Sequence, residues 1–168
     1  MIRKMFFCLL LFTLGATLPC QGGMFRNLGS STHPWRFDGR GFVPGAGEGT
    51  PVILVREGYL PVLRGGELLP TVLLPNRMGV IAGICYLQVA GGKLTPESGS
   101  IPTGGCRVEI VGTDRQIRLA TADRNGFFSL PLPAGNYEVR AAGSPVRFDV
   151  REGKTELVAL RNGKRMVD

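Results

Sequence analysis

Residues 105–142 alternate apolar and polar side chains, and this pattern constrains the fold more than any other feature of the chain. Val108 and Ile110 alternate with charged neighbours, and Tyr137 and Val139 repeat the same period of two. Because successive side chains of a β-strand point to opposite faces, such alternation predicts strands with one buried face. The sequence therefore predicts a β-meander within an antiparallel, all-β domain.

Two turn signals separate the predicted strands. Residues 123–126 read Asp-Arg-Asn-Gly, which supplies a side chain that caps a turn and a glycine able to adopt positive φ. Residues 132–135 read Leu-Pro-Ala-Gly, which places proline and glycine at the second and fourth turn positions. Periodicity and turns together predict seven strands, near residues 79–87, 106–112, 117–122, 127–130, 136–142, 146–150 and 156–160.

The same region resembles carboxypeptidase regulatory-like domains. The resemblance rests on Gly-Ile-Cys at 83–85, the strand at 105–113, Thr-x-Asp-x-x-Gly-x-Phe at 121–128 and Leu-Pro-Ala-Gly-x-Tyr at 132–137. It covers residues 77–161 and implies a seven-stranded, antiparallel, transthyretin-like β-sandwich. These motifs determine a fold and imply no catalysis.

Two features depart from that family's pattern. The segment 86–103 is longer than the usual first connection, and Cys85 and Cys106 stand where the family more often has small or β-branched core residues. Two cysteines in an exported domain pair by default. In the transthyretin-like arrangement the first two strands belong to opposite sheets, so the resemblance implies a disulfide that joins the sheets. The alternative is two buried free thiols. No metal site is expected, because the mature chain has too few other His and Cys residues to complete a zinc site.

The first 23 residues have the layout of a secretory signal peptide. Arg3 and Lys4 precede an apolar run over residues 5–18, and small and polar residues follow it. The run is short for a membrane-spanning helix, which needs about 20 residues. The sequence therefore predicts export to the periplasm, the outer surface or the extracellular space, with no membrane span after signal cleavage. Two alternatives stay open: a lipoprotein acylated at Cys20, and a retained anchor.

The charge pattern argues against a nucleic-acid partner. The formal net charge is +7, or +5 without Arg3 and Lys4, and the remaining basic residues are scattered among acids. Residues 147–151, Arg-Phe-Asp-Val-Arg, are typical of a strand with a solvated face. Because no block of Lys or Arg is interleaved with aromatic residues, the composition predicts only a mild attraction to anionic surfaces or polymers.

Residues 24–50 are rich in glycine, contain two prolines and show no apolar period, which predicts a flexible arm. Residues 33–37 of this arm read His-Pro-Trp-Arg-Phe and form the only aromatic cluster outside the sandwich. Three roles fit Trp35 and Phe37: docking onto their own domain, recognition of a partner, and stacking on a sugar ring.

Residues 51–76 form a predicted β-rich extension, in which apolar runs alternate with turn residues. Because so small a sheet is marginal in water, its apolar surface must pack on the sandwich, pair with another chain or meet a membrane. Pro61 and Pro70 indicate edge strands. Two interpretations stay open, a flap that covers the sandwich and an intermolecular β-augmentation. The residues expected at this contact are Ile53, Val55, Leu60, Val62, Val72 and Leu74.

The residues required for several kinds of catalysis are missing. A serine or cysteine hydrolase needs a base held beside its nucleophile, and the single histidine, His33, lies in the predicted flexible arm. Transthyretin-like hydrolases of purine breakdown products use several histidines and a C-terminal Tyr-Arg-Gly-Ser, whereas this chain ends in Gly-Lys-Arg-Met-Val-Asp. Residues 123–126 hold only a fragment of a calcium loop. The sequence predicts no enzymatic activity, no cofactor and no metal.

The sequence thus predicts a secreted or cell-envelope, non-enzymatic β-sandwich with a structural, adhesive or protein-interaction role. Its expected partner is a protein or a second copy, bound through an edge strand, with residues 51–75 as the main contact. The alternative is a polysaccharide-binding accessory module that uses Trp35, Phe37 and exposed aromatic residues on the sandwich loops. In residues 162–168 the alternation of apolar and polar side chains is lost, which predicts a frayed basic tail.

Overall fold

The computed structural model of the protein describes residues 32–56, 59–66, 74–90 and 99–166, and these residues form β-strands and connecting turns. No helix occurs in these ranges, so none there is long and apolar enough to cross a membrane. The predicted all-β class is confirmed. The strands are β1 (Thr32–Phe37), β2 (Phe42–Pro44), β3 (Val52–Arg56), β4 (Val62–Arg64), β5 (Met78–Ala90), β6 (Gly99–Pro102), β7 (Arg107–Gly112), β8 (Ile117–Thr121), β9 (Phe127–Pro133), β10 (Gly135–Arg140), β11 (Val146–Val150) and β12 (Thr155–Met166).

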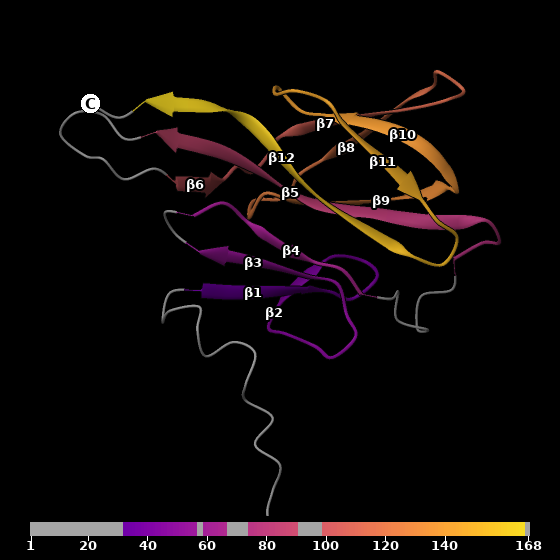
Figure 1. Ribbon diagram of the computed structural model, residues 1–168, viewed down its shortest axis with the longest axis horizontal. Helices are drawn as coiled ribbons and strands as arrows, with labels where there is room; N and C mark the ends of the chain where they lie inside the picture. The colour runs from indigo at the N-terminus through magenta and orange to yellow at the C-terminus, as the bar shows by residue number, and fades with distance from the viewer. Residues whose placement is uncertain (1–31, 57–58, 67–73, 91–98, 167–168) are drawn as a thin grey trace, which may run out of the picture.

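The strands form three stacked sheets (Figure 1). The N-terminal sheet has the order β2-β1-β3-β4, and the outer sheet has the order β11-β10-β7-β8. Between them lies the central sheet, in which β5 pairs with β12 on one side and with β6 and β9 on the other. The outer and central sheets form a β-sandwich, and the N-terminal sheet covers the second face of the central sheet.

Strand β5 is buried on both faces, and its nearly continuous apolar sequence is typical of strands that are covered on both sides. Val80 and Ala82 belong to the core beside the N-terminal sheet, whereas Ile81 and Cys85 belong to the core beside the outer sheet. Strand β12 runs parallel to β5, whereas the other described pairings are antiparallel. The prediction of a wholly antiparallel sandwich is wrong for the β5–β12 pair. Because the strand that precedes β12 belongs to the outer sheet, no hairpin connects β12 to β5 and fixes an antiparallel direction.

The core of the sandwich lies where the alternation predicts it. Val108 and Ile110 of β7 and Val139 of β10 are fully buried, and Tyr137 is 8% exposed. Burying one such side chain stabilises a fold by roughly 1.5 to 3 kcal/mol, so this layer supplies much of the folding free energy. The same core also contains Ile81, Cys85, Cys106, Ala122, Phe128, Leu132, Val150, Val158 and Leu160.

A second apolar core joins the N-terminal sheet to the central sheet. The ring of Phe127 on β9 lies 4.9 Å from that of Trp35 on β1 and 4.6 Å from that of Phe42 on β2. Ile53 of β3 packs in the same cluster with Ile84 of β5. Residues from the predicted arm and from the predicted extension therefore cover the sandwich together.

The arm predicted as flexible over residues 24–50 instead contains β1 and β2. Strand β1 lies between β2 and β3, with Trp35 opposite Ile53, so the predicted boundary at residue 51 does not separate two structural units. The short period of His33, Trp35 and Phe37 was hidden by the proline and glycine residues around it. Only Trp35 and Phe37 mark the inward face, because His33 is exposed, and two such side chains are too few to predict a strand.

Two further predictions need correction. Strand β12 continues to Met166, so the frayed tail predicted for residues 162–168 is wrong as far as the structure describes it. Its register shifts between Arg161 and Lys164, which explains why the alternation is lost there while pairing with β5 resumes beyond. Strand β6 lies in the long segment 86–103, where no separate strand was predicted, and it pairs with the far half of β5. The described strands from β5 to β12 therefore number eight, one more than predicted.

Candidate functional site

The structure separates the predicted contact residues into a buried group and an exposed group. Ile53 and Phe37 are 0% and 1% exposed and lie in the cores between the N-terminal and central sheets. Val55, Leu74 and Trp35 are partly buried and pack against the same cores. These five side chains contact their own sandwich, as the flap interpretation expects.

Leu60 and Val62 are predicted contact residues that are exposed, with 54% and 47% of their surface accessible. Beside them lies Tyr59, whose backbone carbonyl accepts a hydrogen bond from the Ser100 hydroxyl on β6 at 2.5 Å. Val72 lies outside the described residues. The described part of the extension is thus mainly internal, and its exposed part ends in the short strand β4.

Strand β8 exposes two larger apolar side chains at an edge of the outer sheet. Ile117 and Leu119 are 60% and 51% exposed. Within the described residues β8 pairs with β7 alone, where Leu119 lies opposite Glu109. Alternate residues of an edge strand direct their N–H and C=O groups away from the sheet. Strand β8 therefore combines exposed apolar side chains with backbone groups that another strand can pair with.

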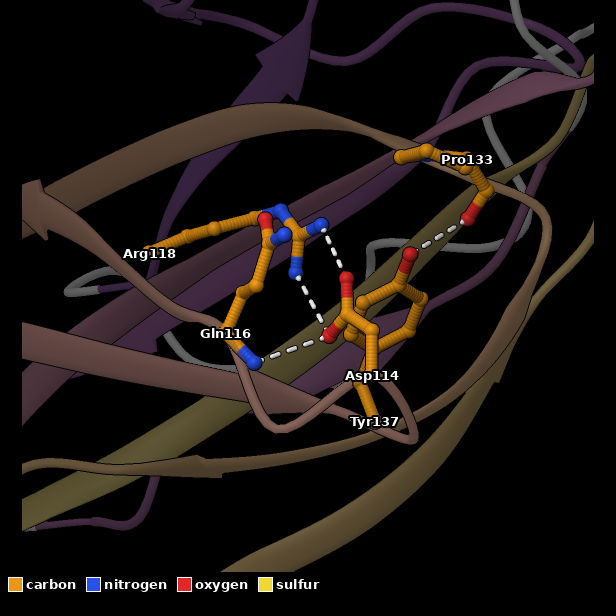
Figure 2. Close-up of polar contacts among 5 residues, drawn as sticks. All are labelled: Asp114, Gln116, Arg118, Pro133 and Tyr137. Carbon is orange, nitrogen blue, oxygen red and sulfur yellow. Dashed lines mark hydrogen bonds and ion pairs between the residues drawn. The ribbon is translucent and has the colours of Figure 1, made fainter.

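The turn before β8 holds this strand in place (Figure 2). The Asp114 carboxylate accepts hydrogen bonds from the Arg118 guanidinium at 2.7 and 3.4 Å and from the Gln116 backbone N–H at 3.0 Å. The hydrogen bonds from Arg118, and then that from Gln116, lower the pKa of the Asp114 carboxyl. Arg118 also lies 5.9 Å from the ring of Tyr137, whose hydroxyl donates to the Pro133 carbonyl at 2.9 Å. One face of β8 is therefore anchored, and the opposite face is exposed.

The other edges of the outer and N-terminal sheets carry features that discourage pairing with another strand. Strand β11 follows Pro145 and exposes the charged side chains of Arg147 and Asp149. Strands β2 and β4 have three residues each, with a proline in or beside them. Strand β8 has five residues and no proline, and its one charged side chain is held by the preceding turn. It is the least protected of these four edges.

The sequence analysis predicted a strand at β8 but missed its contact face. The sequence signal for this face is the pattern Ile-Arg-Leu-Ala-Thr, in which the larger apolar residues take the solvent-facing positions. Ala120 packs against the sandwich core and Arg118 is half-buried, whereas the larger apolar residues point to solvent. Where apolar residues take the solvent face of a strand, they indicate a surface that another molecule can cover.

A second candidate site is the hollow between the N-terminal sheet and the turn at residues 123–126, which we call the Trp35 cleft. Its volume is about 640 Å³, within the range of small-ligand sites. Trp35 and Phe127 line it with Val55, and Arg124 and Asn125 contribute polar groups from the turn. The predicted sugar-binding residues are thus divided, because Trp35 lines the cleft whereas Phe37 is buried.

His33 also lines the Trp35 cleft. His33 is the second residue of β1. Because side chains alternate between the two faces of a strand, His33 lies on the same face as Trp35. None of the residues that line the cleft is Ser, Thr or Cys. Among the described residues, no group of three or more His, Cys, Asp or Glu side chains could hold a metal ion.

The two sandwich cysteines are close together in the core. Cys85 is 0% exposed on β5, and Cys106 is 5% exposed just before β7, so they come from facing sheets. Both are thiols in this structure, and their side chains lie near each other. Burial, and then the contact with Cys106, raises the pKa of the Cys85 thiol. Thiolate attack inside the folded core is therefore slow, so oxidation is expected before the core closes.

We expect a Cys85–Cys106 disulfide in protein recovered from an oxidising compartment. Closing this loop stabilises a fold by roughly 3 kcal/mol in the chain-entropy model, so reduction should lower the free energy of unfolding by about that amount. Alkylation of the denatured, unreduced protein followed by mass spectrometry checks the bond. Protein retained in a reducing cytosol serves as the control and should alkylate at both cysteines. Alkylation of both residues in the exported protein would contradict the prediction.

Similarity to known proteins is found in the comparison with solved structures. No protein-family model matches the chain, and no curated protein matches it in sequence. Among solved structures, the Bacillus anthracis TIE protein is similar to 73% of the chain, at 15% sequence identity and a TM-score of 0.36. The chain spans 23% of the length of that protein.

Proposed function

We propose that this chain is an exported, non-enzymatic β-sandwich protein that binds another protein chain by adding a strand at β8. The observation that carries the proposal is the contrast between this edge and the other edges of the outer and N-terminal sheets. Ile117 and Leu119 are exposed on an edge strand that contains no proline and whose one charged side chain, Arg118, is held by the preceding turn. The export component rests on the signal-like layout of the first 23 residues.

Strand addition suits β8 for two physical reasons. Its backbone offers hydrogen bonds to any extended segment, and the exposed side chains of Ile117 and Leu119 offer apolar area to alternate residues of that segment. Its geometry is also fixed in advance by the Asp114–Arg118 ion pair, which reduces the entropy lost on binding. A second copy is the simplest partner, because two β8 strands paired antiparallel around Leu119 would form a two-fold symmetric contact.

The double substitution Ile117→Lys and Leu119→Lys tests the proposal. It should weaken self-association by at least about tenfold, since lysine on an edge strand opposes pairing with another strand. Sedimentation velocity over a range of protein concentrations measures the association. The melting temperature should stay close to that of the wild type, because both side chains already point to solvent.

The matched control places the same charge on the opposite edge of the same sheet. Val146→Lys on β11, where the wild-type residue is 38% exposed, should leave association unchanged. Equal association of the wild type and the β8 double variant would exclude a second copy as the β8 partner. Weaker association of the Val146→Lys variant alone would move the interface to β11.

The topology of the sandwich is a further part of the proposal. We infer a transthyretin-like arrangement of the carboxypeptidase regulatory-like type for the sandwich. The motifs at residues 121–128 and 132–137 support it, and both lie at turns that join strands of the two facing sheets. Asp123 caps the first of these turns by accepting backbone hydrogen bonds from Asn125 and Phe127 at 2.8 and 2.9 Å.

Polysaccharide binding is the second candidate function, and the position of Trp35 favours it. Trp35 lines a cleft beside two polar side chains, which is the combination that a sugar ring requires. This function uses a different face of the molecule from β8, so the two proposals stand or fall separately.

A further inference from the structure

The Trp35 cleft has an apolar surface that is fixed by packing. The Trp35 ring lies 4.9 Å from the ring of Phe127, which is 4% exposed and belongs to the core beneath the N-terminal sheet. Val55 packs against the same core from β3. Because these side chains come from paired strands and a buried cluster, the indole is held in one orientation beside the hollow.

The polar side of the cleft is a rigid turn. The N–H of Gly126 donates to the Asp123 carbonyl at 3.0 Å, and the N–H of Asp123 donates to the Phe127 carbonyl at 2.7 Å. Gly126 has a φ of 83°, which favours glycine, and the backbone of Gly104 packs closely against that of Arg124. The turn therefore presents Arg124 and Asn125 to the cleft from a fixed backbone.

The charge of the cleft has one sign. Arg124 supplies its positive charge, and no Asp or Glu lines the cleft. The nearest carboxylate in the sequence, Asp123, accepts hydrogen bonds from two backbone N–H groups of its own turn. Within the described part of the chain Arg124 forms no ion pair. An anionic group entering the cleft would therefore meet a guanidinium that has no competing protein carboxylate.

We propose that the Trp35 cleft binds a uronic acid unit of an acidic polysaccharide. A pyranose ring has an apolar C–H face, which would lie on the Trp35 indole, and a polar edge, which would meet the Asn125 amide. The ring's carboxylate would receive charge-assisted hydrogen bonds from the Arg124 guanidinium. This inference rests on the polysaccharide-binding function given above as the second candidate, and it specifies the ligand class.

The shape and charge of the cleft select this ligand over two others. A neutral sugar would satisfy the indole but leave Arg124 without its ionic partner. An acidic peptide would satisfy Arg124 but lacks the flat C–H face that matches the indole. Both are included as probes, so that each can overturn the assignment.

Fluorescence titration of the full exported chain tests the proposal, because Trp35 is the only tryptophan. Trigalacturonic acid should change the fluorescence in a saturable way, whereas neutral galactotriose and a triaspartate peptide should bind at least about tenfold more weakly. Raised salt should reduce the advantage of the acidic sugar over the neutral one. Isothermal titration calorimetry provides a second readout that does not depend on the indole.

Arg124→Gln should remove the preference for the acidic sugar and weaken its binding about tenfold, since it deletes the ionic partner of the carboxylate. The matched control is Arg147→Gln on β11, which removes the same charge from a side chain that is 89% exposed elsewhere on the sandwich. This control should bind trigalacturonic acid like the wild type.

The outcomes separate the ligand class from the broader function. Equal binding of the neutral and acidic sugars would overturn the uronic acid assignment and retain polysaccharide binding. No saturable change with either sugar would overturn both. Equal losses in the Arg124 and Arg147 variants would show attraction by net charge alone, and tight binding of triaspartate would make the cleft a peptide site. Each of these results would contradict the proposal.

Discussion

The Ile53→Asp substitution is expected to lower the free energy of unfolding by more than about 4 kcal/mol and to unfold the whole domain. Ile53 is 0% exposed and packs with Ile84 and Phe127 between the N-terminal and central sheets. A carboxylate at this position would have no partner, and the strands that contact it also form one side of the sandwich. The loss should therefore spread from the N-terminal sheet to the central sheet.

Urea denaturation followed by circular dichroism measures this effect, and Val62→Asp is the matched control. Val62 lies on β4 in the same sheet and is 47% exposed, so a carboxylate there stays in water and should change stability by less than about 0.5 kcal/mol. A folded Ile53→Asp protein of wild-type stability would show that the N-terminal sheet does not pack on the sandwich.

The Gly83→Ala substitution is expected to destabilise the protein by about 3 kcal/mol or more, although it adds a single methyl group. A Cβ at Gly83 would clash with the backbone carbonyl oxygen of Val158 and would lie 2.9 Å from the ring of Phe128. The Val158 oxygen belongs to β12, the parallel neighbour of β5, so it cannot move without disturbing the central sheet. The clash would force these two strands apart.

Gly65→Ala is the control for this prediction, because a Cβ at Gly65 would meet no atom within 4 Å. Its free energy of unfolding should match that of the wild type or rise slightly, since alanine restricts the unfolded chain. Chemical denaturation of both variants checks the pair of expectations. Equal stabilities for the Gly83 and Gly65 variants would contradict the close packing of β5 on β12.

Alternation and turn chemistry were sufficient to predict the sandwich strands other than β6. The period of two placed Val108, Ile110 and Val139 in the core, where they are fully buried. The Asp-Arg-Asn-Gly sequence predicted a turn that the structure closes with an Asp123 cap. These features depend on neighbours in the sequence, so the sequence alone determines them.

Strands β1 and β2 of the N-terminal sheet could not be predicted in the same way, because their stability depends on contacts distant in sequence, whereas β3 and β4 lie in the predicted β-rich extension. Trp35 is fixed by Phe127, about ninety residues away, and no local pattern indicates that pairing. One signal was available. The run of apolar residues in β5 is too continuous for a strand with a solvated face, and it indicates a second covering layer.

The candidate sites share this limitation. Exposure of Ile117 and Leu119 follows from the inward position of Arg118, which depends on an ion pair with the preceding turn. The Trp35 cleft joins residues from β1 and from the turn at residues 123–126, which the sequence separates by more than eighty positions. Sequence patterns identified Trp35 as a candidate, whereas its neighbours required the folded structure.

Site-specific photo-crosslinking in the native cell tests the central claim, a protein partner bound at β8, most directly. A photoreactive amino acid at Leu119 should yield a discrete crosslinked protein, identified by mass spectrometry as a second copy or as a different protein. The same probe at Val146, on the opposite edge of the outer sheet, should yield no such product. Absence of a crosslinked protein from Leu119, or identical products from both positions, would contradict binding at β8.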